Sequence, residues 1–109
     1  MGLREERVAR NEASTREINE RIEESYGSHR LDTHLSIACE CGLAECDIFL
    51  RVTKSEYEDV RSDARRFLIE RTHLIADVEV VVLDNERFTV VEKREGEPAE
   101  IATQTDPRS

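Results

Sequence analysis

Three cysteines lie close together in this chain, at Cys39, Cys41 and Cys46. An odd number of closely spaced cysteines does not fit a disulfide framework, and in a reducing compartment such thiols are metal-bound or free. Zinc accepts sulfur donors readily and takes four ligands in a tetrahedron. Gly42, directly after the second cysteine, permits the tight backbone course that a metal-binding turn requires. The cluster therefore predicts a turn folded around one structural zinc ion.

A structural metal would also compensate for a shortage of apolar side chains. Of the 109 residues, 38% are apolar and 38% are charged, and there is no tryptophan. A chain of this length forms one domain, here with a small core, and bound structural zinc contributes on the order of 10 kcal/mol to folding. We expect a single zinc-stabilised domain over residues 1–93, of which 1–10 form a frayed helix end. Residues 94–109, with two prolines and no apolar period, are expected to be a disordered acidic tail.

The fourth zinc ligand must come from one of three histidines. His29 lies among small and polar residues and is expected at the surface. His34 begins the strand that leads to Cys39, and would lie about 16 Å from it in an extended chain. His73 follows a short extended segment that could run alongside the cysteines. We therefore favour His73, with His34 as the alternative; three ordinary cysteines, or iron–sulfur or redox chemistry, are the competing interpretations of the cluster.

A long N-terminal helix is predicted from residue 3 to about residue 26. The segment is rich in Glu and Arg and contains no proline. Its apolar stripe is thin and consists of Val8, Thr15, Ile18, Ile22 and Tyr26, spaced as on one helix face. Gly27 and Ser28 are expected to end the helix.

The central segment predicts a hairpin followed by a short helix. Apolar residues alternate over 35–39 and 48–52, which predicts two strands with the cysteines at the tip of their hairpin. The sequence Thr-Lys-Ser-Glu at 53–56 is a capping box. Tyr57 and Val60, three positions apart, would form the buried face of the helix that follows.

A second hairpin is predicted further along. Residues 67–69 are a brief extended segment, and the β-branched run over 78–83 is typical of a central strand. Asp84-Asn85 is expected to turn the chain into a strand over 88–92. Together these elements predict an α+β fold: a long N-terminal helix, a small mainly antiparallel sheet of two hairpins, one short helix and a single zinc knuckle.

The charge favours a protein partner over nucleic acid. The net charge is −9 and acidic side chains are concentrated around the cysteines, which suits a basic protein surface and opposes phosphate binding. Four arginines that could contact nucleic acid are expected instead to balance carboxylates: Arg61, Arg65, Arg66 and Arg71. Self-association through the N-terminal helix is a further possibility. No apolar run suggests a signal peptide or a membrane span, so we expect a cytoplasmic protein.

No constellation of residues predicts catalysis. A site of three cysteines and one histidine leaves zinc no open position for water. The HExxH pair of zinc proteases, the paired motifs of zinc deaminases and a glycine-rich phosphate loop are all absent. Glu40, Glu45 and Asp47 could be general bases, but are expected to be solvated surface residues. We therefore expect a zinc-binding interaction or regulatory module rather than an enzyme, with a thiol-based redox or metal sensor that releases zinc on oxidation as the alternative.

Several short motifs resemble a family of short, uncharacterised bacterial proteins. They comprise Cys39-Glu40-Cys41-Gly42 with Cys46, Glu56-Tyr57, Val60-Arg61, Arg66-Phe67, His73 and Val90-Val91-Glu92-Lys93. The resemblance extends from the first helix to the last strand. Members typically have Gly-His where this chain has Thr72-His73, and Pro where it has Ala64. The resemblance implies a shared zinc-like site formed by a CxCG-x3-C motif and a downstream histidine, and it implies no known activity.

Overall fold

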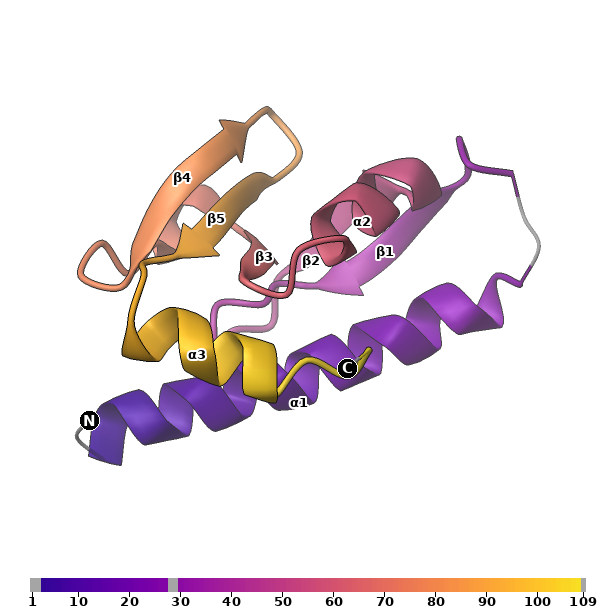
Figure 1. The fold of residues 1–109 in the computed structure, drawn as a ribbon. Coiled ribbons are helices and arrows are strands. Elements are labelled where there is room, and N and C mark those ends of the chain that lie inside the picture. Colours follow the sequence, from indigo (N-terminus) through magenta and orange to yellow (C-terminus); the bar gives the residue numbers. More distant parts are fainter. Residues whose placement is uncertain (1–2, 28–29, 109) are drawn as a thin grey trace.

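The computed structural model describes residues 3–27 and 30–108 and shows an α+β fold. The elements in chain order are α1 (Leu3–Ser25), β1 (His34–Ala38), β2 (Phe49–Thr53), α2 (Lys54–Arg61), β3 (Arg66–Ile69), the 3-10 turn η1 (Arg71–His73), β4 (Glu79–Asp84), β5 (Thr89–Lys93) and α3 (Glu97–Gln104). Helix α1 runs along the whole molecule, with β1 beside its C-terminal half and α3 beside its N-terminal half (Figure 1). The predicted fold class is confirmed.

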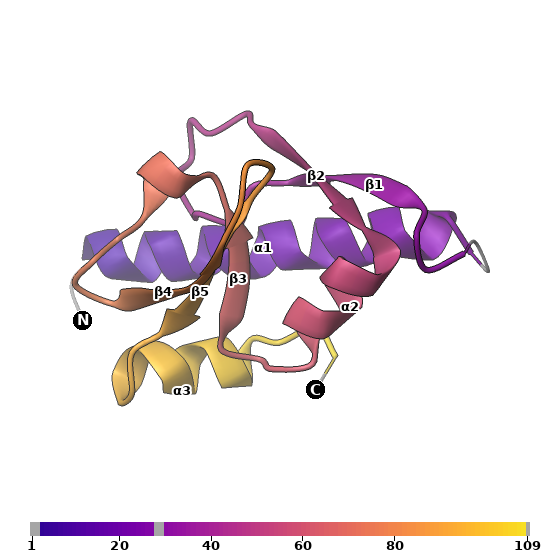
Figure 2. The same cartoon turned by 90° about the horizontal axis from the view of Figure 1, so that it is seen from above.

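The strands form two small antiparallel sheets instead of one. β1 and β2 pair as the predicted hairpin, with Leu35 opposite Val52 and Ile37 opposite Leu50. The second hairpin, β4–β5, gains β3 on its other side, so that this sheet has the order β3-β5-β4. Viewed from above, both sheets lie over α1 (Figure 2). Their inward side chains form one shared core, because each sheet alone has too few strands to be stable.

The predicted capping box is present at the start of α2. The Thr53 hydroxyl accepts a hydrogen bond from the Glu56 N–H, and the Glu56 carboxylate accepts one from the Thr53 N–H. Tyr57 and Val60 are both buried, as predicted. The cap therefore fixes where β2 ends and α2 begins.

Helix α1 packs Ile22 and Tyr26 of the predicted apolar stripe against the core, but it also buries polar residues, which the stripe did not predict. Glu12, Arg16, Asn19 and Glu23 are all buried, whereas Ile18, a member of the predicted stripe, is half exposed. Buried polar groups need hydrogen-bond partners. The structure supplies partners for Asn19 from the end of β1, for Glu12 from β5 and for Arg16 from α3.

The C-terminal segment forms a helix within the described residues 94–108, which corrects the expectation of a disordered tail over residues 94–109. It contains α3, with Pro98 in the first turn, where a missing N–H costs nothing. The small side chains of Ala99 and Ala102 are buried against the rest of the molecule. Composition did not reveal this helix because its stability depends on what it packs against.

None of the helices in the described part of the chain is long and apolar enough to cross a membrane.

Candidate metal centre

The cysteine loop continues directly from the first hairpin. The Cys39 N–H donates to the Ile48 carbonyl oxygen at 2.9 Å, which extends the β1–β2 pairing by one step. The chain then turns through Gly42, whose φ is +78°, and the Cys46 N–H donates to the Leu43 carbonyl oxygen at 3.1 Å. This turn brings the three thiols to one end of the hairpin. None of these three cysteines forms a disulfide.

His73 reaches the same place from the other sheet. The Glu40 N–H donates to the Leu68 carbonyl oxygen at 2.7 Å, so β3 runs beside the cysteine loop. Immediately after β3, Glu70 caps η1 by accepting a hydrogen bond from the Thr72 N–H, and its carbonyl oxygen accepts one from the His73 N–H. The one-turn helix aims the imidazole back at the cysteines.

The four side chains converge to a geometry that could hold one metal ion. One ligand atom from each of Cys39, Cys41, Cys46 and His73 lies within 4.8 Å of every other. The His73 Nδ1 is 3.6 Å from the Cys39 Sγ and 3.5 Å from the Cys46 Sγ. In a tetrahedron with zinc–sulfur bonds of about 2.3 Å and zinc–nitrogen bonds of about 2.05 Å, a sulfur and a nitrogen ligand would be about 3.6 Å apart. The donor set therefore fits a tetrahedral ion.

Backbone N–H groups are directed at two of the sulfurs. The Glu70 N–H donates to the Cys39 Sγ at 3.1 Å, and the Leu43 N–H donates to the Cys41 Sγ at 3.5 Å. Donors of this kind favour thiolate over thiol, the form that binds metal. The Cys39 and Cys41 side chains are buried and Cys46 is half-buried, so the cluster lies partly at the surface.

The three thiols ionise unequally because they share hydrogen bonds. A hydrogen bond from the Cys39 thiol, together with the Leu43 N–H, lowers the pKa of Cys41 to about 5. The same hydrogen bond and burial raise the pKa of Cys39, and burial raises the pKa of Cys46. Cys41 is therefore the thiol that ionises most readily, and so the first that can offer a thiolate to a cation.

The sequence analysis did not predict the polar side chains of α1 that hold the cysteine loop in place by hydrogen bonds. The Asn19 amide bonds both backbone groups of Ala38: its Nδ2 donates to the carbonyl oxygen at 2.9 Å and its Oδ1 accepts from the N–H at 2.8 Å. The Nδ2 also donates to the Glu40 carboxylate at 2.8 Å, and Asn11 on the same helix donates to the Gly42 carbonyl oxygen at 3.0 Å. The signal for these contacts was the spacing of polar residues along one face of the first helix.

Glu40 corrects the expectation of a solvated surface carboxylate. Glu40, which lies between Cys39 and Cys41 in the sequence, has a fully buried side chain. Its second carboxylate oxygen accepts a hydrogen bond from the Leu68 N–H at 2.9 Å. Burial raises its pKa. Glu40 therefore joins α1, the cysteine loop and β3, whereas Glu45 and Asp47 are exposed as expected.

Gly42 is required by a close approach as well as by its backbone angle. A Cβ built there would lie 2.7 Å from the Val8 carbonyl oxygen and 2.7 Å from the Glu12 Cγ. No side chain fits between the loop and α1. The long helix therefore packs directly against the backbone of the cysteine turn.

The other two histidines do not join the cluster. His34 is exposed at the start of β1, and the group of possible ligands does not include it. His29 and the predicted helix stop at Ser28 lie outside the described residues. Gly27, with φ of +59°, follows the end of α1 as expected of a helix stop.

Comparison with known proteins adds no assignment to this geometry. No family model, no curated protein and no solved structure matches the chain at a significant level.

Proposed function

We propose that this protein binds one zinc ion through Cys39, Cys41, Cys46 and His73, and that the ion holds the domain together. The observation that supports it is the convergence of three sulfurs and one nitrogen within 4.8 Å of one another, with two nitrogen–sulfur distances that match the edge of a tetrahedral zinc site. Soft thiolate donors with one imidazole favour zinc over magnesium or calcium.

The ion is structural in this proposal. Four protein ligands leave zinc no position at which to activate water, so we do not expect the site to catalyse a reaction. Its ligands come from the end of β1, from the loop before β2 and from η1 after β3. A single ion would thus join the two sheets, each of which has few strands and both of which contribute to one small core.

Metal analysis of the untagged full chain tests this. We expect one zinc per chain, and we expect cobalt substitution to give the absorption of a tetrahedral, sulfur-rich site without exchangeable water. His73→Ala should lose the ion or admit water as a ligand. His34→Ala, a matched change at an exposed histidine, should bind zinc as the unmodified chain does. Metal-free protein that folds cooperatively in the presence of chelator would refute the proposal.

The zinc-stabilised domain acts, in this proposal, as a protein-interaction module. Strand β4 lies at the edge of its sheet and exposes three consecutive apolar side chains, with 47% of Val81, 42% of Val82 and 49% of Leu83 accessible. Exposed apolar edges of this kind are sites of association. The net charge of −9 favours a partner with a basic surface.

Arginine pairing supports a protein partner rather than nucleic acid. Arg65 pairs with Asp63, Arg66 with Glu92 and Arg71 with Asp84. Arg61 is buried and pairs with Asp106. The charge of each of these four arginines is balanced by a carboxylate within the chain.

Affinity purification with the full chain as bait tests the interaction role. We expect a stoichiometric protein that is released by salt and lost when Val82→Lys interrupts the β4 edge. Leu31→Lys, at a residue that is 62% exposed and lies away from β4, is the matched control and should retain the partner. Sedimentation of the isolated chain tests self-association, including through α1. No partner and no self-association would contradict an interaction module.

A redox or metal sensor is the second candidate, and the half-buried position of Cys46 favours it. This thiol is the most accessible of the three, so an oxidant could reach it before the others. Titration with mild peroxide while zinc release is followed separates the two functions. A structural site should retain zinc at peroxide concentrations at which a sensor has released it.

A further inference from the structure

A cavity of about 310 Å³ lies between the N-terminal half of α1, α3 and the sheet that contains β5. These elements meet at the end of the molecule where α3 lies beside α1 (Figures 1 and 2). Ligand pockets in proteins have volumes of about 300–1,000 Å³, and an apolar cavity of about 150 Å³ can hold a benzene molecule. This cavity is therefore large enough for a small ligand of two fused rings.

Most of the cavity wall is hydrocarbon. Val8 and Ala9 line it from α1, Ile101 and Ala102 line it from α3, and Val78 lines it from the segment directly before β4. Alanine at positions 9 and 102 leaves room that larger side chains would fill. A wall of this kind favours a ligand that is itself mostly hydrocarbon.

The buried charges in the wall are paired within the chain. The Lys93 ammonium donates to the Glu12 Oε2 and to the Glu79 Oε2, each at 2.6 Å. These three side chains form a buried ion triad and are 5%, 6% and 1% exposed. Lys93 and Glu12 line the cavity, so the charge nearest to a ligand already has its counter-charge.

The remaining polar groups of the wall need no ligand either. The Thr105 hydroxyl donates to the Ile101 carbonyl oxygen at 2.8 Å, and the other charged lining residues, Asp77 and Glu97, are exposed to water. Some buried side-chain nitrogen and oxygen atoms in the described part of the chain lack a hydrogen-bond partner, but none of them belongs to a residue that lines the cavity. The wall therefore asks for no hydrogen-bonding or charged group on a ligand.

A charged ligand would have to compete with the ion triad. An anion beside Lys93 competes with the two carboxylates, and a cation beside Glu12 competes with the ammonium group. Either exchange leaves a buried charge without its present partner, which is costly. Burial raises the pKa of Glu12 to about 7, so near neutral pH a proton removes part of the net negative charge of the triad. An uncharged ligand disturbs none of these groups.

We propose that this cavity binds a small uncharged molecule, mostly hydrocarbon and about the size of two fused six-membered rings, between α1 and α3. Its affinity comes from apolar surface that is removed from water on binding. The site is separate from the cysteine cluster, because none of the four candidate metal ligands lines it.

The test uses three naphthalene probes with the full chain at constant zinc content. Naphthalen-2-ylmethanol is uncharged, naphthalen-2-ylmethylamine is a cation and naphthalene-2-carboxylate is an anion at neutral pH. Each is titrated while amide and methyl NMR signals are recorded. We expect saturable shifts for Ile75, Val78 and Ile101 with the uncharged probe, and at least tenfold weaker binding of both charged probes. Equal or tighter binding of a charged probe, or no saturable shift with the uncharged probe, would overturn the proposal.

Two variants on different elements locate the binding. Ala9→Leu and Val78→Phe each place a larger side chain in the wall, and each should weaken binding of the uncharged probe at least tenfold. Ser14→Leu is the matched control, since it also replaces a small side chain of α1 with leucine, but at an exposed position outside the lining. It should bind the probe as the unmodified chain does.

Amide spectra of the variants show which of them keep the fold, and either filling variant is sufficient for the test. Undiminished binding by a folded filling variant would refute the assignment. Shifts centred on the exposed side chains of Val81 and Leu83 in β4, instead of on the cavity wall, would refute it as well.

Discussion

The cysteine cluster and the buried arginines stabilise this small core in different ways. The cysteine cluster (Cys39, Cys41, Cys46 and His73) brings donors together for an ion that the chain does not contain. The charges of the arginine core (Arg16, Arg61 and Asp106) are paired within the chain itself. There the Asp106 carboxylate, carried by the segment after α3, pairs with both buried guanidinium groups.

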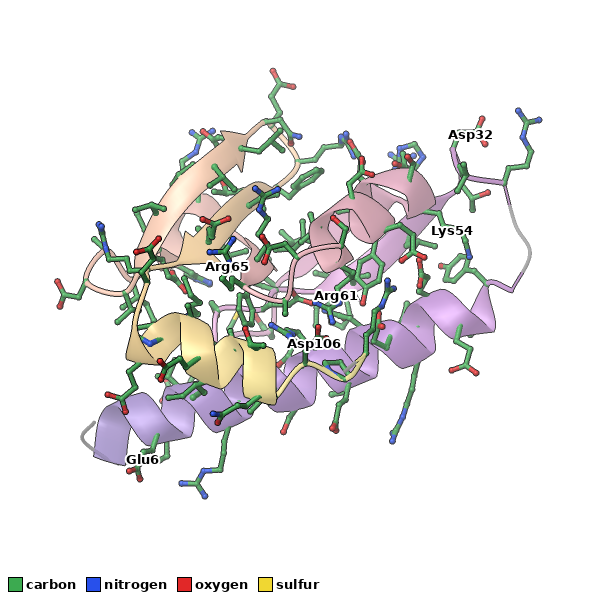
Figure 3. All side chains as sticks on the ribbon, viewed as in Figure 1. Glu6, Asp32, Lys54, Arg61, Arg65 and Asp106 are labelled. Atoms are coloured by element: carbon green, nitrogen blue, oxygen red, sulfur yellow. The ribbon has the colours of Figure 1, made fainter. Side chains whose placement is uncertain are left out.

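The arginine core is internal to the molecule. Arg61 and Asp106 point toward one another between α2 and the C-terminal segment (Figure 3). Arg16 is fully buried, lies 4.3 Å from the centre of the Phe67 ring and donates to the Ala64 carbonyl oxygen at 2.9 Å. A chain with few apolar residues can therefore replace part of its core with polar cross-links, provided that each buried charge is paired.

The largest expected effect is that of removing zinc from the cysteine cluster. A strong chelator at neutral pH should remove an apparent stabilisation on the order of 10 kcal/mol and abolish cooperative unfolding of the whole domain. Both regions should unfold together because α1 contacts each of them. Circular dichroism during thermal unfolding, with hydrogen exchange of α3 amides, measures this. Protected α3 amides in the chelated protein would show instead that the arginine core is stable without the cluster.

Breaking the arginine core should have the next largest effect. Asp106→Ala leaves two buried guanidinium groups without their shared carboxylate, and we expect a loss of about 3–5 kcal/mol. Urea unfolding at constant zinc measures it. Asp32→Ala removes a comparable ion pair with Arg30, but both of those side chains are exposed, so we expect a loss of less than about 1 kcal/mol. Similar losses in the two variants would mean that the buried pairing contributes little.

The buried ion triad of Glu12, Glu79 and Lys93, in which the ammonium group pairs with both carboxylates, predicts how stability depends on pH. Burial raises the pKa of Glu12 to about 7 from 4.5; Lys93 and Arg16 lower this pKa, and Glu79 raises it further. Between these two values the folded chain binds the proton more tightly than the unfolded chain, so this contribution to stability falls as pH rises through the window. A shift of this size corresponds to about 3 kcal/mol.

Glu12→Gln isolates this contribution. Because glutamine does not titrate, the stability of the unmodified chain should decline relative to that of the variant between about pH 4.5 and about pH 7, and the difference should be constant above that window. Urea unfolding of both proteins is measured at saturating zinc. The pH dependence that comes from the cysteines is then the same in the two proteins and cancels in the difference. Parallel pH profiles would contradict the raised pKa.

The smallest expected effect concerns the contact between the cysteine loop and α1. Gly42→Ala and Gly27→Ala both place alanine at positive φ, which costs roughly 1–2 kcal/mol. Only at Gly42 would the new methyl group meet backbone, at 2.7 Å from the Val8 carbonyl oxygen, whereas nothing lies within 4 Å of it at Gly27. We expect Gly42→Ala to cost about 2 kcal/mol more than Gly27→Ala in thermal unfolding. Equal costs would mean that the loop moves away from α1 without penalty.

Local patterns in the sequence determined the elements whose causes are local. Alternation predicted the β1–β2 hairpin, the spacing of Thr53 and Glu56 predicted the cap of α2, and the run of cysteines predicted where a metal could bind. Each of these signals depends on residues that are close together in the chain. The α+β class followed from them.

The tertiary structure decided which polar side chains are buried and whether the C-terminal segment folds. Lys93 and Glu12 are 81 positions apart, and Arg16 receives its carboxylate from beyond α3. A charged residue can be buried only if a partner from elsewhere in the fold reaches it, and no periodicity within one helix records that partner. For the same reason the buried polar residues of α1 were not predicted, although Ile22 and Tyr26 of its predicted stripe do pack against the core. Helix α3 was not predicted at all.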